Sequence, residues 1–151
     1  MTTETVAQLK LDLIRDEGVR LTPYLDCCGK GWRECSCATK GYLTIGIGRN
    51  LDALGITREE AEFLLAGDIK RTVREQAEAF PWTLDLSLAR QRVIANMLFN
   101  MGLATLKQFK NTLAAMRNNL TQEVINGMLA SKWARQVGAR ATRLAKLWER
   151  G

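Results

Sequence analysis

The chain has 151 residues, 46% of them hydrophobic, which is enough for a substantial core in one folded domain. Its formal net charge of +6 favours polyanionic partners, and its lack of histidine excludes Ser-His-Asp and Cys-His nucleophilic catalysis and histidine metal sites. The first residues lack the basic and apolar segments of a signal peptide, and no apolar run is long enough to predict stable membrane insertion.

The first predicted element is a helix over residues 3–17, where apolar residues recur at helical spacing and Gly18 can end the helix. Residues 18–56 contain short extended pieces and many glycines. In the segment 41–48, GYLTIGIG, aliphatic residues alternate with other types, as they do in a β-strand. These signals predict a small β-hairpin lobe.

A capping box opens the next predicted helix, because Thr57 can cap it and Glu60 follows three residues later. This helix spans about residues 57–79 and ends before Pro81. Beyond Pro81 the pattern indicates helices alone: one from a Ser87 cap to about residue 102, one from about 105 to 117, one capped by Thr121 and one ending near Trp148.

We therefore predict an α+β fold of one domain, residues 1–151. A small N-terminal β-hairpin lobe (18–56) would be joined by the long helix (57–79) to a helical C-terminal lobe. That lobe would comprise residues 82–151 and the N-terminal helix 3–17. The sequence contains no repeat, low-complexity tract or flexible linker that would indicate a second domain.

Glu17 is the leading candidate for a catalytic acid. It lies in the last turn of the first predicted helix, where the helix dipole and the unpaired carbonyl groups disfavour its ionised form. Glycoside hydrolysis suits a chain without histidine, because a protonated carboxylic acid can donate to the leaving oxygen. On position alone, however, a solvated carboxylate at a helix end is the more common role.

Two segments, residues 16–26 (DEGVRLTPYLD) and 41–48 (GYLTIGIG), closely resemble the catalytic core of the phage-type lysozymes, or endolysins, of glycoside hydrolase family 24. That family has Glu-Gly at the end of its first helix, followed by Tyr-x-Asp and a Thr-Ile-Gly strand. The resemblance implies a lysozyme-like fold, with Glu17 as the general acid, Asp26 as the second carboxylate and Thr44 as the third member of the catalytic set.

Gly46 and Gly48 are expected to share a strand face with Thr44, and their missing side chains would leave a shallow groove for a sugar. The simpler alternative is an ordinary hairpin strand with glycines at bulges. The later segment NMLFNMG resembles the central helix of the family. There Phe99 and Asn100 would stack on and hydrogen-bond to N-acetylated sugars, unless Phe99 packs in the core instead.

The resemblance extends to the C-terminal region. It implies that Arg140 approaches Glu17, forms an ion pair with it in the free enzyme and belongs to the substrate-binding set. Trp133 fits core packing better than ligand binding. Many family members carry histidine where this chain has Arg49, so a guanidinium with permanent charge would take over any structural role of that histidine.

An insertion of about a dozen residues, relative to the family, precedes Thr44 and holds every cysteine of the chain: Cys27, Cys28, Cys35 and Cys37. Disulfides would fit the even count and a destination outside the reducing cytosol. Free thiols would fit synthesis in the cytosol, and a four-thiolate zinc site would fit the number of ligands but not the usual Cys-x-x-Cys spacing. A bond between the adjacent Cys27 and Cys28 would be strained. No other metal site and no cofactor is expected.

The resemblance implies a lysozyme that hydrolyses the β-1,4 bond between N-acetylmuramic acid and N-acetylglucosamine in bacterial peptidoglycan and so lyses the host cell. We expect a monomer, made in the host cytoplasm, that reaches the periplasm or cell wall after holin-type release. The alternatives are a lytic transglycosylase, a non-catalytic cell-wall-binding module and a basic nucleic-acid binder. The last is disfavoured because no recognition helix or stacking motif is present, so we expect no nucleic-acid partner.

Overall fold

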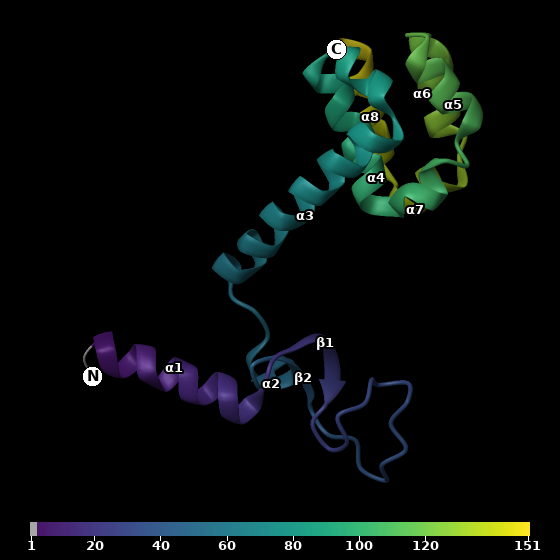
Figure 1. The fold of residues 1–151 in the computed structure, drawn as a ribbon. Coiled ribbons are helices and arrows are strands. Elements are labelled where there is room, and N and C mark those ends of the chain that lie inside the picture. Colours follow the sequence, from purple (N-terminus) through teal and green to yellow (C-terminus); the bar gives the residue numbers. More distant parts are fainter. Residues whose placement is uncertain (1–2) are drawn as a thin grey trace. The chain divides into compact units, whose positions relative to one another are not determined.

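The computed structural model describes residues 3–151 (Figure 1). It divides into two compact units, one reaching to Ala61 and the other spanning Glu62–Gly151, and the division falls in the first turn of helix α3 (Arg58–Ala79). The α+β fold class is confirmed, because a small antiparallel sheet lies in the first unit and helices make up the second. Among the helices of residues 3–151, none combines the length and the apolar composition needed to cross a lipid bilayer.

The first unit consists of α1 (Thr3–Glu17), β1 (Arg20–Leu25), β2 (Leu43–Gly46), β3 (Arg49–Asn50) and α2 (Leu51–Leu54). The prediction that the first helix ends at Glu17 is confirmed. Gly18 follows with a φ of +70°, and its N–H donates to the Ile14 carbonyl at 3.0 Å. Glycine adopts this left-handed conformation easily, so the chain can turn from α1 into the sheet. The expected grouping of α1 with the helical lobe stays a prediction.

The strands form an antiparallel sheet in the order β1-β2-β3, and the predicted hairpin is present. Strand β1 pairs with β2 so that Tyr24 lies opposite Thr44, and the register shifts between Arg20 and Tyr24. Pro23, which has no N–H to donate, lies within this irregular stretch. Because β1 is an edge strand, it tolerates a residue that cannot complete the ladder.

Strand β2 ends at Gly46, earlier than the alternation in the sequence indicates. Gly46 and Gly48 have φ values of +70° and +68°, so the chain turns here before it enters β3. The expectation that Gly48 shares the strand face of Thr44 is therefore wrong. Gly48 belongs to the turn, and the side-chain alternation of a strand does not extend into it.

Helix α3 begins at the predicted capping box. The Glu60 N–H donates to the Thr57 hydroxyl at 3.2 Å, and the Glu60 carboxylate accepts the Thr57 N–H at 2.8 Å. The helix ends at Ala79, before the 3₁₀ helix η1 (Pro81–Asp85). Both ends therefore follow from local signals, the reciprocal cap and the proline.

After η1, the second unit continues with α4 (Leu88–Leu106), α5 (Lys110–Arg117), α6 (Thr121–Leu129), α7 (Lys132–Val137) and α8 (Ala139–Arg150). The Ser87 cap of α4 is confirmed, because its hydroxyl accepts the Arg90 N–H at 3.3 Å. The predicted end of this helix at about residue 102 is confirmed by the backbone, because Gly102 is non-helical (φ 75°, ψ 161°) and a kink there divides α4 into two helical pieces.

Three helix starts in this unit differ from the predictions. Helix α5 begins at Lys110, later than expected, because α4 extends into the region assigned to it. Thr121 does not cap α6, since it is the first helical residue and its hydroxyl accepts a hydrogen bond from Arg90 at 3.1 Å. Helix α7 was not predicted, although Ser131 provides a typical cap by accepting the Ala134 N–H at 3.0 Å.

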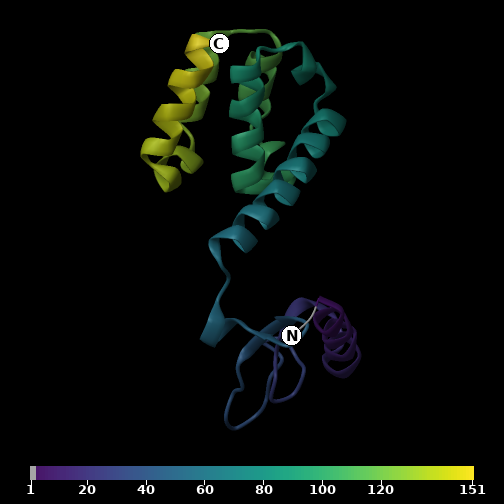
Figure 2. The same cartoon turned by 90° about the vertical axis from the view of Figure 1, so that its left-hand side faces the viewer.

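The large hydrophobic core lies in the second unit, where several helices each bury one face. Helix α8 packs against α4, α6 and α7, and α5 packs against α6 (Figure 2). Trp148 is completely buried close to the end of α8, which stops near the predicted position. The buried apolar residues of this core are Phe80, Leu86, Val93, Ile94, Met97, Leu98, Leu106, Ala115, Met116, Val124, Met128, Trp133, Ala134, Ala141, Leu144 and Trp148.

Candidate active site

Glu17 is the last residue of α1, and its side chain lies against the turn that follows β2. A Cβ atom placed on Gly48 would stand 2.9 Å from Oε2 of Glu17 and 3.1 Å from its Cδ. The carboxyl group therefore occupies space that a side chain at position 48 would need. Within residues 3–61, no cation forms an ion pair with Glu17.

Asp26 follows β1 and is held by the segment that leads into β2. Its Oδ1 atom accepts the Tyr42 N–H at 2.8 Å, and its own N–H donates to the Tyr42 carbonyl at 3.1 Å. Gly41 permits this close approach. A Cβ atom there would overlap Oδ1 of Asp26 and lie 2.7 Å from the backbone nitrogen of Cys27. The Asp26 carboxylate is thus fixed beside the sheet.

Thr44 is connected to Asp26 through the same residue. Its hydroxyl donates to the Tyr42 carbonyl at 3.2 Å, and only 5% of Thr44 is exposed. The backbone of Tyr42 therefore binds two members of the predicted catalytic set. The sequence pattern does not single out Gly41 or Tyr42, and the one available signal is their place directly before the Thr-Ile-Gly strand.

Arg49, which stands where many phage-type lysozymes have histidine, has the structural role that was predicted. Its two terminal nitrogens donate to the two carboxylate oxygens of Glu60 at 3.0 and 3.1 Å, and its Nε donates to the Gly55 carbonyl at 3.1 Å. Hydrogen bonding from the Thr57 N–H, and then the Arg49 charge, lower the pKa of Glu60. This bidentate ion pair joins β3 to the start of α3.

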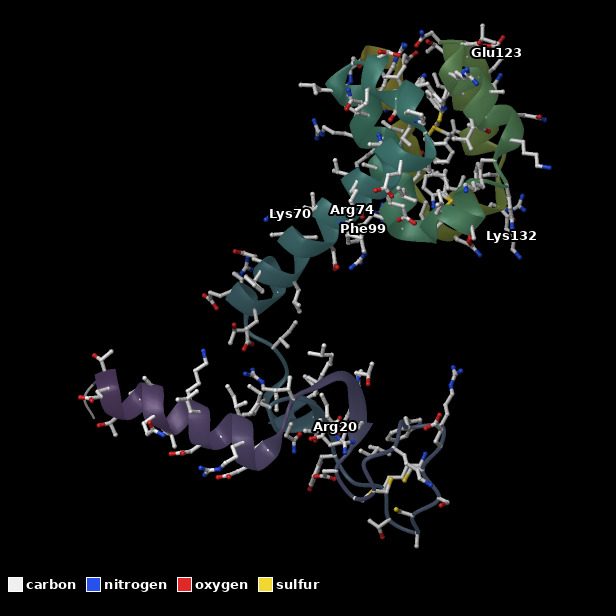
Figure 3. All side chains as sticks on the ribbon, in the orientation of Figure 1. Arg20, Lys70, Arg74, Phe99, Glu123 and Lys132 are labelled. Atoms are coloured by element: carbon white, nitrogen blue, oxygen red, sulfur yellow. The ribbon has the colours of Figure 1, made fainter. Side chains whose placement is uncertain are left out.

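In the second unit, α3, α4 and α8 line a cavity of about 430 Å³. Phe99 of α4 lines it and is 47% exposed, so it does not pack in the core (Figure 3). Arg140 of α8 also lines it, and its Nε donates to Oδ1 of Asn96 at 2.9 Å. Leu65 and Ile69 of α3 add apolar surface. An aromatic and apolar wall beside a fixed guanidinium suits a sugar that carries acidic groups.

Asn100 lies apart from this cavity and has another partner. Its Oδ1 atom accepts the indole N–H of Trp133 at 2.8 Å, and Trp133 is buried as predicted. Phe99 lines the cavity and Asn100 does not, so the structure does not bring these two predicted residues to one surface. The expected ion pair between Arg140 and Glu17 stays a prediction.

The four cysteines are free thiols in the loop between β1 and β2, and their Sγ atoms lie within 4.8 Å of one another. A hydrogen bond from the Cys37 backbone, with those of neighbouring thiols, lowers the pKa of Cys35 to about 7. Hydrogen bonds to neighbouring sulfur atoms, that of Cys27 first, raise the pKa of Cys37 to about 12. The four sulfur atoms form one interacting group in this structure, and the disulfide alternative stays a prediction.

Known proteins point to the same family as the motifs. The phage lysozyme family model matches residues 15–150. The probable T4-type lysozyme 2 of Dictyostelium discoideum is 27% identical over 176 residues, which cover 97% of this chain and 96% of that protein. The pre-baseplate central spike protein Gp5 of Enterobacteria phage T4 is 27% identical over 163 residues, which cover 89% of this chain but only 26% of that protein. The chain therefore belongs to the phage lysozyme family.

Proposed function

We propose that this chain is a muramidase that hydrolyses the β-1,4 bond between N-acetylmuramic acid and N-acetylglucosamine in peptidoglycan. Membership of the phage lysozyme family supports a lysozyme-type cell-wall hydrolase. Hydrolysis of this particular bond is supported by the arrangement of two carboxylates in the first unit. Glu17 ends α1 against Gly48, and Asp26 is fixed on Tyr42, which also binds Thr44.

In this proposal Glu17 is the general acid, which donates its proton to the leaving glycosidic oxygen as the C–O bond breaks. Asp26 is the general base and takes a proton from the attacking water, whose oxygen bonds to the anomeric carbon. The Thr44 hydroxyl orients that water. Attack from the face opposite the leaving group inverts the configuration, and such enzymes hold their two carboxyl groups about 6.5–9.5 Å apart.

The residues proposed for substrate binding are Gly46, Gly48, Phe99, Asn100 and Arg140, each on the basis of its own surroundings. Gly46 has open space where a side chain would stand, which leaves room for a sugar. Phe99 offers a stacking surface, and Arg140 offers a charge for the acidic groups of the wall polymer. The Asn100 oxygen is bound by Trp133, so its amide NH₂ remains to donate to an N-acetyl carbonyl.

The variant Glu17→Gln tests the proposal. The amide cannot donate a proton as a carboxylic acid does, so the rate of turbidity loss on purified peptidoglycan should fall by about 100-fold or more while the fold is kept. Asp16→Asn is the matched control. It changes the neighbouring carboxylate, which Arg15 binds at 2.8 Å, and should keep activity near that of the wild type. Full activity in Glu17→Gln, or an equal loss in both variants, would contradict the role of Glu17.

Mass spectrometry of the released muropeptides separates the proposed reaction from its rivals. A hydrolase leaves reducing N-acetylmuramic acid ends that incorporate oxygen from isotopically labelled water. A lytic transglycosylase leaves anhydro ends without that oxygen, and a non-catalytic binding module sediments with peptidoglycan without clearing it. Either of these last two results would refute hydrolysis.

We also propose that the chain is made in the host cytoplasm and lyses the host after release across the membrane, because peptidoglycan lies outside that membrane. Bacteria that express the chain alone should stay intact until a membrane-permeabilising agent is added. Bacteria that express Glu17→Gln should stay intact after it as well. Lysis by the wild type without the agent would contradict a separate release step.

A further inference from the structure

We infer that the four cysteines of the loop between β1 and β2 bind one zinc ion, through residues that the proposed reaction does not use. All four Sγ atoms, from Cys27, Cys28, Cys35 and Cys37, lie within 4.8 Å of one another. Figure 3 shows yellow sulfur atoms gathered inside this loop. Cys27 and Cys28 are exposed and the other two are half-buried, so an ion can reach the sulfur atoms from solvent.

Two of the distances between the sulfur atoms match those expected around a tetrahedral ion. The Sγ atom of Cys27 lies 3.8 Å from that of Cys28 and 3.7 Å from that of Cys35. Zinc–sulfur bonds of about 2.3 Å in a tetrahedral site place the sulfur atoms about 3.8 Å apart. Bonded sulfur atoms of a disulfide are only about 2.05 Å apart. Four soft thiolate ligands in a tetrahedral arrangement are typical of zinc or iron sites, and zinc is the ion inferred here.

A backbone turn holds the first pair of cysteines, Cys27 and Cys28. After β1, the Gly29 N–H donates to the Leu25 carbonyl at 2.8 Å, and the Leu25 N–H donates to the Lys30 carbonyl at 2.8 Å. The first cysteine pair therefore lies on a tight turn. The Arg20 guanidinium, labelled in Figure 3, donates to the Gly29 carbonyl at 2.8 Å and holds this turn on the sheet. These contacts order the first cysteine pair, which limits the entropy that this part of the loop loses when an ion binds.

The charges of the loop favour a metal–thiolate complex. One zinc ion neutralises only part of the charge of four thiolates, so the complex is anionic. Between residues 27 and 41 the loop carries three cations and one anion, Lys30, Arg33, Lys40 and Glu34. Lys40 is also fixed by the Trp32 ring, with Nζ at 3.9 Å from its centroid. The excess of positive charge stabilises an anionic complex.

The zinc site has a structural role, because four protein ligands leave no open position for water or substrate. Cys27 directly follows Asp26, and Tyr42 binds that carboxylate at the other end of the loop. Residues 27–41 form no helix or strand, so few backbone hydrogen bonds hold them. Zinc would fix this segment, and each thiol would lose its proton on binding.

The test is the metal content of the full chain, purified with reductant and zinc and then dialysed against metal-free buffer. We expect one zinc ion per chain, and a cobalt-substituted form with the visible absorption of a tetrahedral thiolate site. Cys35→Ser and Cys37→Ser should each lose the bound zinc. Ser36→Ala is the matched control, since it lies between these two ligands and removes no thiolate. It should retain the zinc.

Two further measurements do not depend on whether the cysteine variants fold or on whether the proposed hydrolysis is correct. In the wild type, the thiols should react with a thiol reagent only after a chelator is added, and Glu17→Gln should hold as much zinc as the wild type. The inference is overturned by four reactive thiols in the presence of zinc, by disulfides in the freshly purified chain, or by bound iron in place of zinc. A Cys28→Ser chain that keeps its zinc would overturn the four-thiolate site.

Discussion

Replacing Gly48 with alanine should displace the proposed general acid without changing it chemically. The new Cβ atom would stand 2.9 Å from Oε2 of Glu17, whereas ordinary van der Waals contact begins at 3.4 Å. Because the Glu17 side chain is flexible, its carboxyl group should move by about 0.5 Å or more while the backbone stays in place. A misplacement of about 1 Å can lower a catalytic rate about 100-fold, so we expect a loss of about tenfold or more.

The same substitution also strains the backbone, and Gly55→Ala isolates that effect. Gly48 and Gly55 both have positive φ values, +68° and +56°. A positive φ costs an alanine about 1–3 kcal/mol, and Gly55, with a ψ of −147°, lies in a region that few residues other than glycine adopt. No atom lies within 4 Å of a Cβ atom added to Gly55. Gly55→Ala should therefore lose at least as much free energy of unfolding as Gly48→Ala, but only Gly48→Ala should lose lytic activity.

The assay is the initial rate of turbidity loss on purified peptidoglycan, at a temperature where both variants are folded. Denaturant unfolding gives the free energy of unfolding of each variant. If Gly48→Ala clears peptidoglycan as fast as the wild type, then Glu17 is not the acid that this turn positions. The same conclusion follows if Gly55→Ala loses as much activity as Gly48→Ala.

Two further predictions concern positions near the site. Gly41→Ala should lower both thermal stability and the rate of turbidity loss, because its Cβ atom would overlap the Asp26 carboxylate. Gly31→Ala is the control and should change neither quantity, because the nearest atom to its added Cβ lies at 3.9 Å. Hydrogen bonding from the Thr57 N–H lowers the pKa of Glu60 below its ordinary value of 4.5. The ionised carboxylate therefore stabilises the fold above pH 4.5, and this stabilisation is lost as the pH falls through the lowered pKa. Thermal unfolding from neutral to acid pH should therefore show a weaker pH dependence in Glu60→Gln, and identical profiles would contradict this.

Much of the fold could be predicted because its signals act over a few residues. Gly18 ends α1 and Thr57 caps α3, and each needs only its neighbours in the chain. The errors lie where distant contacts decide. The short helical piece after the Gly102 kink was not predicted, and its last residue, Leu106, is buried in the core. The Thr121 hydroxyl is bound by an arginine of another helix and is not used as a cap.

The members of the candidate site could be named from the sequence, but their connections could not. The resemblance identified Glu17, Asp26 and Thr44. The bonds from the Tyr42 backbone to the last two depend on where the intervening loop returns to the sheet. The cysteine spacing likewise departs from the common zinc pattern, and the turns of the loop bring the sulfur atoms together.

Tyr42 binds Asp26 and Thr44 through main-chain atoms, while 61% of the tyrosine remains exposed. Evolution can therefore exchange the side chain at this position freely and keep both bonds. Proline is the exception, because it has no N–H for the Asp26 carboxylate. A search for shared side chains would pass over a position that acts through its main chain in this way.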